Sequence, residues 1–137
     1  MIVRVGTVTT LYPSEGKVRV QYADRDETSV KLPLLAHEYK MPEIGKVVLT
    51  AHMEGRSSGF VLGEFWSDVN KPKESGEKLF RQELGEGAYI RWKDGELKLV
   101  SPKIVFQTDA GTVTMEQLVA LFNRVTDLEN RVSRLGV

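Results

Sequence analysis

The sequence predicts a mainly β protein with an N-terminal five-stranded barrel of the OB type, a region of short strands, and a C-terminal helix that forms a parallel coiled coil. Three observations predict this class. Apolar residues from Ile2 to about Phe65 mostly alternate with polar ones, which is the period of strands that bury one face. Short strand-like runs return after residue 78, and a heptad pattern follows them. The predicted divisions are 1–66 for the barrel, 67–78 for a linker, 79–113 for the short strands and 114–136 for the helix.

The barrel strands are separated by segments with turn composition. In KVRVQY, valine and tyrosine alternate with polar residues, and the preceding Pro13-Ser14-Glu15-Gly16 is a turn by composition, so the first two strands should pair as a hairpin. Gly6 lies where the alternation in the first strand changes phase, as a bulge or sharp bend requires. Five strands with a bent first strand suit a small OB barrel. The later strands are predicted at Thr28–Leu35, Lys46–Met53 and Gly59–Phe65.

Residues 67–78, SDVNKPKESGEK, predict a linker or solvated loop, because their only apolar residue is Val69. Very short strands are expected after it, with Asp94-Gly95 as a strong signal for a two-residue hairpin. A sheet this thin has no second layer, so we expect something outside the chain to cover its apolar side chains. The short strands are predicted at Ala88–Trp92, Leu97–Val100 and Lys103–Thr108.

The C-terminal segment has the clearest pattern. Thr114 and Gln117 have the spacing of a capping box, and Gly136 is expected to end the helix. Between them, leucine and valine recur at alternating spacings of three and four, which is the a and d pattern of a coiled coil. The a and d residues are Leu118, Leu121, Val125, Leu128, Val132 and Leu135.

The number of chains is predicted from the charges beside this pattern. β-branched residues at a with leucine at d favour two chains. However, the segment from Arg124 to Glu129 resembles the Arg-h-x-x-h-Glu motif of short trimeric coiled coils, in which the arginine pairs with a glutamate of a neighbouring chain. We therefore expect a homotrimer. The alternative is a single amphipathic helix packed on its own barrel, which the narrow apolar stripe disfavours. The predicted trimer interface is Leu118, Leu121, Arg124, Val125, Leu128, Glu129, Val132 and Leu135.

Composition and motifs argue against an enzyme. Nineteen basic and nineteen acidic side chains cancel, so a nucleic-acid partner is not expected. His37 and His52 lie on separate predicted segments without a second ligand at metal-binding spacing, and each fits a core or surface histidine. The GRSSG run at 55–59 joins two strands, whereas a nucleophile elbow needs a strand followed by a helix. We therefore predict no catalytic residues, metal site, cofactor or small-molecule substrate.

The order of the N-terminal segments resembles a known family. RVGTVTTLYPSEGKVRVQY, then LPLL, then MPEIGKVVLTAHMEGRSSGFVLGEFW are similar to the OB domain of the baseplate spike family of contractile phage tails, which includes baseplate assembly protein V. Tail-like bacteriocins and the type VI secretion spike use related parts. The similarity covers about the first half of the chain. The matching residues are Gly6, Val18-Arg19-Val20, Pro42 with Gly45, Val48, and Gly59-Phe60-Val61-Leu62-Gly63.

The resemblance implies a structural homotrimer, with the OB domains as a collar and the strands of 79–113 as a trimeric β-prism or β-helix needle. It implies a spike or hub protein of a phage tail or tail-like injection particle, with baseplate hub proteins as partners. The His-x-His iron site of many spike tips has no counterpart here.

The expected location follows from the same resemblance. The sequence has no signal peptide and no long apolar run, so synthesis is expected in the host bacterial cytoplasm, followed by incorporation into the baseplate of the virion or particle. Contact with the target-cell envelope stays an open alternative. Two other functions are also considered: an OB-fold nucleic-acid-binding module with an oligomerisation helix, and an enzyme or carbohydrate-binding domain of the same particle.

Overall fold

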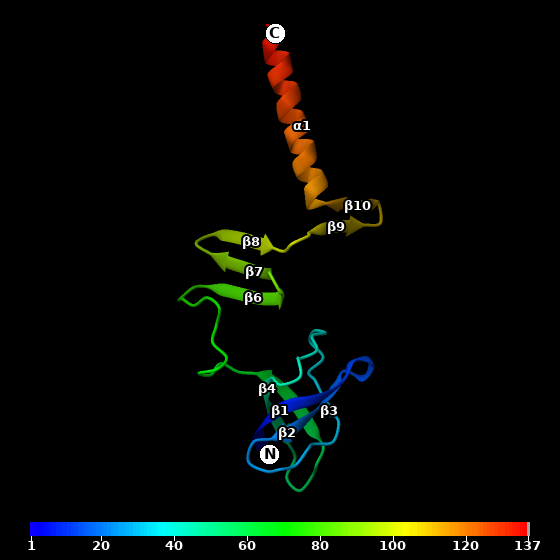
Figure 1. The fold of residues 1–137 in the computed structure, drawn as a ribbon, viewed down its shortest axis with the longest axis vertical. Helices are drawn as coiled ribbons and strands as arrows, with labels where there is room; N and C mark the ends of the chain where they lie inside the picture. The colour runs from blue at the N-terminus through cyan, green and yellow to red at the C-terminus, as the bar shows by residue number, and fades with distance from the viewer. Residues whose placement is uncertain (137) are drawn as a thin grey trace. The chain divides into compact units, whose positions relative to one another are not determined.

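A computed structural model describes residues 1–136, and the chain divides into two compact units at Pro72 and Lys73 (Figure 1). The first unit is a five-stranded antiparallel sheet with the strand order β3-β2-β1-β4-β5. A parallel bridge between Leu34 and Val61 joins its two edges, so the sheet is nearly closed into a barrel. The strands are β1 (Ile2–Tyr12), β2 (Lys17–Tyr22), β3 (Leu32–Pro33), β4 (Val47–His52) and β5 (Gly59–Glu64), with a 3-10 turn at Pro13–Glu15.

The barrel encloses a small core built mainly from valine. β-branched side chains fit the inner face of a pleated sheet, and alternation along each strand brings them to the same side. The register of β1 shifts between Val8 and Thr10, a few residues beyond the bend predicted at Gly6. Gly6 is required for a different reason: a Cβ there would lie 2.7 Å from Cγ2 of Val20. The buried core residues are Val8, Val18, Val20, Tyr22, Leu32, Val48 and Val61.

The second unit contains a three-stranded meander, a hairpin and one helix. The two-residue turn of Asp94 and Gly95, both with positive φ, joins β7 to β8 as the sequence predicted. The predicted capping box is also confirmed, because Gln117 N donates to Thr114 Oγ1 at 3.1 Å and Thr114 N donates to Gln117 Oε1 at 2.9 Å. The elements are β6 (Phe80–Gly85), β7 (Ala88–Lys93), β8 (Glu96–Val100), β9 (Val105–Thr108), β10 (Gly111–Thr114) and α1 (Met115–Arg134).

The predicted fold class is wrong in two parts. The described chain contains a single helix of 20 residues and not a coiled coil. The strands after residue 78 form a meander and a hairpin within one chain, and not the strands of a β-prism or β-helix. Each of these strands pairs with its neighbour in sequence because tight turns connect them, so the sheet is completed locally. The coarser statement holds: the chain is mainly β and begins with a nearly closed five-stranded barrel.

Candidate functional site

The apolar stripe of α1 is exposed along its whole length. Its six a and d residues range from 41% exposed at Leu118 to 77% at Leu135, and no residue of the helix is buried. An isolated helix of this length is marginally stable in water, and most helices in proteins are stabilised by packing one apolar face. Since nothing in its own unit covers this face, the stripe is the leading candidate for an interface.

Two charges lie on opposite sides of the stripe. Arg124 and Glu129 are five residues apart, so they are roughly 140° apart around the helix. Neither makes an ion pair within residues 1–136, whereas Arg131 and Asp127 on the same helix pair at 3.1 Å. In a parallel assembly, this arrangement presents the arginine of one copy to the glutamate of the next.

The second unit has no buried side chain of its own among residues 73–136. The β6–β8 sheet nevertheless has an apolar face, because the register places Phe80, Trp92 and Leu97 in one cross-strand row and Ile90 and Leu99 in the next. Four of the five are about half exposed, so this face also lacks a cover in the single chain.

The opposite face of the same sheet is polar and carries an ion-pair network. Arg91 Nη2 lies 2.8 Å from Glu74 Oε2, and Arg91 Nε donates to Glu74 Oε1 at 2.9 Å. Arg81 Nη1 also donates to Glu74 Oε1 at 3.2 Å, while Arg81 Nε donates to Glu83 at 2.6 Å. The hydrogen bonds from Arg91, followed by those from Arg81, lower the pKa of Glu74 from 4.5 to about 2. Glu74 lies in the segment that the sequence predicted as linker, and no local pattern reveals this contact.

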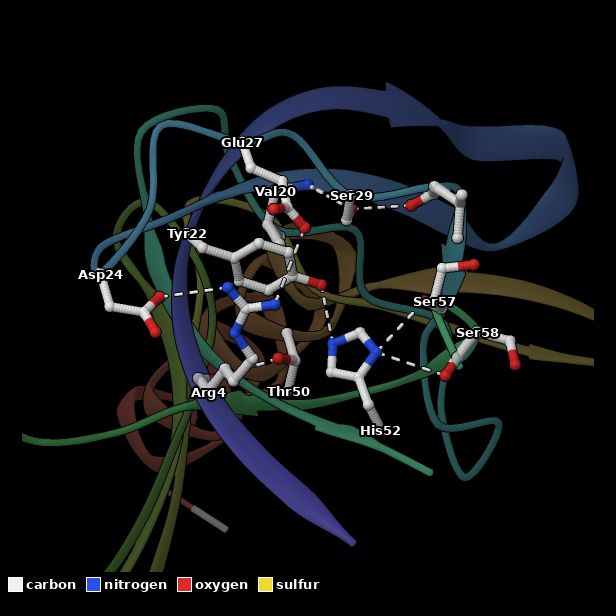
Figure 2. Close-up of polar contacts among 11 residues, drawn as sticks. Arg4, Val20, Tyr22, Asp24, Glu27, Ser29, Thr50, His52, Ser57 and Ser58 are labelled. Atoms are coloured by element: carbon white, nitrogen blue, oxygen red, sulfur yellow. Dashed lines mark hydrogen bonds and ion pairs between the residues drawn. The ribbon is translucent and has the colours of Figure 1, made fainter. Parts of the chain in front are cut away.

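A buried polar cluster lies inside the barrel (Figure 2). His52 is 5% exposed, and its Nδ1 lies 3.2 Å from the carbonyl oxygens of both Ser57 and Ser58. Those carbonyls only accept, so Nδ1 carries the proton and Nε2 accepts from the hydroxyl of Tyr22 at 2.7 Å. The guanidinium of Arg4 stacks 3.6 Å from the centre of the Tyr22 ring, and burial raises the pKa of that tyrosine.

This cluster links several elements of the barrel. Both nitrogens of His52 are occupied, one by a tyrosine on β2 and the other by the loop between β4 and β5. On the other side of Tyr22, Arg4 donates to Asp24 at 3.2 Å, and its Nη1 lies 3.9 Å from Glu27. The contacts therefore connect β1, β2, β4 and two loops. His37, by contrast, is exposed and lies 3.8 Å from Glu38.

Removing the Tyr22 hydroxyl tests this link. Tyr22→Phe leaves Nε2 of a buried histidine without a donor, so we expect the barrel to lose about 2 kcal/mol of unfolding free energy. Urea unfolding followed by fluorescence measures the change. Tyr39→Phe is the matched control, because its exposed hydroxyl donates to Pro13 O at 3.2 Å, and its effect should stay within about 0.5 kcal/mol. Equal effects of the two substitutions would contradict the structural role of the cluster.

No protein-family model matches the sequence, and no curated protein matches it significantly. Among residues 1–136, no group of three or more His, Asp or Glu side chains is arranged to hold a metal ion. Among residues 1–136, no helix combines the length and the apolar character that a membrane span requires. The features that bear on function are therefore the exposed stripe, the charges beside it, and the resemblance of the barrel sequence to the baseplate spike family.

Proposed function

We propose that the chain is a structural subunit that assembles as a homotrimer through the apolar stripe of α1. The observation that carries this proposal is an exposed heptad row on a helix with no buried side chain. The barrel has its own core and provides a folded head, while the helix provides the contact between copies. The association of three chains, and not two, is supported by Arg124 and Glu129, which make no ion pair within residues 1–136 and flank the stripe on opposite sides.

The size of the stripe is sufficient for a reversible assembly. Completing the burial of a half-exposed leucine or valine contributes about 1 kcal/mol, and each chain offers five such residues in addition to the more exposed Leu135. Association opposes this gain through lost translational and rotational freedom. The helix alone therefore gives a modest affinity, which the apolar face of the β6–β8 sheet would raise if the assembly covers it as well.

We also propose that this trimer belongs to the baseplate of a contractile phage tail or a tail-like injection particle, as a spike or hub component. The support is the similarity of residues 4–66 to the OB domain of the baseplate spike family. The role would be mechanical, with the barrel binding hub proteins of the baseplate. Mass spectrometry of purified tail particles from the encoding organism tests this placement. We expect the chain in complete particles at a multiple of three copies, and its absence from them would contradict the placement.

A second candidate is an OB-fold module that binds nucleic acid, and the barrel architecture is the observation in its favour. The balanced charge argues against it, because binding to phosphate backbones depends on an excess of basic side chains. We expect no binding of a fluorescent 20-nucleotide single strand at micromolar protein in low salt, measured by anisotropy. Salt-sensitive binding in this range would favour the second candidate over the first.

A further inference from the structure

The segment between the two units is partly ordered by side-chain contacts. Its first part is held locally, since Asn70 Nδ2 donates to Phe65 O at 2.9 Å and Ser67 Oγ accepts from the Asn70 backbone at 3.1 Å. Val69 is 91% exposed. Further along, the side chain of Glu74 is only 29% exposed, because it lies on the polar face of the β6–β8 sheet.

The geometry of this contact is specific. Both carboxylate oxygens of Glu74 accept from the guanidinium fork of Arg91, which is the bidentate arrangement that gives the strongest ion pairs. The register places Arg81 directly opposite Arg91 on the neighbouring strand. Like charges in directly opposed positions destabilise a sheet, and Glu74 bridges both of them. Glu74 therefore stabilises the sheet as well as its own segment.

We propose that Glu74 acts as a latch that holds residues 73–79 on the polar face of the β6–β8 sheet. The free part of the connector between the two units is then limited to the residues before Lys73. Opening the latch would release about seven residues, which is roughly 24 Å of extended chain. This device does not depend on the oligomeric state or on the proposed function. It concerns the second unit and the segment that leads into it.

The latch should open in acid. Glu74 contacts Arg81 on β6 and Arg91 on β7. The same face of the sheet also carries Glu83 on β6, Tyr89 on β7, and Lys98 and Glu96 on β8, with Lys73 beside Glu74 on its own segment. The pKa of Glu74 is lowered from 4.5 to about 2 by the arginines. A carboxylate whose pKa is lowered in the closed form stabilises that form fully when the pH is above the ordinary pKa of the group. This stabilisation is lost as the pH falls through the lowered pKa. The latch is therefore closed at neutral pH and opens progressively between about pH 4.5 and pH 2.

Limited trypsin digestion tests the latch, because Lys73 and Lys78 lie inside the held segment. In Glu74→Gln, we expect cleavage after Lys78 about tenfold faster than in the unmodified chain, since proteolysis follows the population of the open form. Cleavage after Lys73 is not compared, because the substitution itself removes the acidic residue next to that bond. Glu77→Gln is the matched control; its carboxylate lies three residues away and is exposed, and its cleavage rate should be unchanged. Circular dichroism verifies that both variants keep the fold.

Nuclear magnetic resonance of the Arg91 guanidinium gives an independent measurement. The Nε–H signal of Arg91, which donates to Glu74, should move toward the position of a free arginine between pH 4.5 and pH 2 in the unmodified chain and should lie there throughout in Glu74→Gln. Glu74→Asp keeps the charge but shortens the side chain, so an intermediate cleavage rate is expected. Equal cleavage of Glu74→Gln and the unmodified chain would overturn the proposal. Equally fast cleavage of Glu77→Gln would do the same, because the effect would then reflect charge alone.

Discussion

We expect Val125→Asp combined with Leu128→Asp to convert the proposed trimer to single chains. Both side chains lie in the middle of the apolar stripe, about half exposed in the single chain, and packing between copies would remove them from water. Two unpaired carboxylates at these positions lose their hydration on assembly, so the dissociation constant should rise at least roughly a thousandfold. Multi-angle light scattering coupled to size exclusion measures the change in mass directly.

The helix content should fall together with the mass. A 20-residue helix without a packed face is marginal in water, so the single chains should lose most of the α-helical signal in far-ultraviolet circular dichroism. The barrel should remain folded, because its core lies in the other unit. Thr126→Asp with Asn130→Asp introduces the same charges on the side of the helix away from the stripe and should leave the mass unchanged. A trimer that survives the first pair of substitutions would refute the stripe as the interface.

Gly59→Ala strongly destabilises the barrel. A Cβ at this position would collide with the backbone carbonyl oxygen of Ala51 and would lie 2.7 Å from Nδ1 of His52. Neither atom belongs to a flexible side-chain end, so β4 and β5 must separate locally and the buried histidine must move. We expect a loss of about 3 kcal/mol of unfolding free energy, measured by urea denaturation.

The neighbouring Ser58 provides the control for this substitution. Its backbone carbonyl accepts from His52, and Ser58→Ala keeps that group, so the unfolding free energy should change by less than about 0.5 kcal/mol. Because the core of the barrel and the stripe of α1 lie in different units, Gly59→Ala should leave the mass of the folded assembly unchanged. If Gly59→Ala lowered the unfolding free energy by less than about 1 kcal/mol, the result would contradict the close approach of β4 and β5 at this position.

The local parts of the fold could be predicted from the sequence because they follow short periods. The alternating valines correctly predicted the β1–β2 hairpin, and the Asp94-Gly95 turn correctly predicted the pairing of β7 with β8. The capping box at Thr114 was also predicted correctly. Each of these features is decided by residues within a few positions of one another, which is the range that patterns report.

Other features depend on contacts between distant residues. β6 was not predicted, because FRQELG has a weak alternation and becomes a strand only by pairing with β7. The Tyr22–His52 hydrogen bond joins residues 30 positions apart, and the Glu74–Arg91 pair joins residues 17 apart. The β-prism was inferred from resemblance alone, and the tight turns between the strands complete the sheet within one chain instead.

The mass of the unmodified protein in solution tests the central claim most directly. Sedimentation velocity over a concentration series, from about 1 to 100 μM, separates the species and shows their interconversion. The account predicts a species of three times 15.4 kDa that dominates at the higher concentrations. A species of 15.4 kDa at every concentration would contradict it, because the exposed stripe of α1 would then have no partner among copies of this chain.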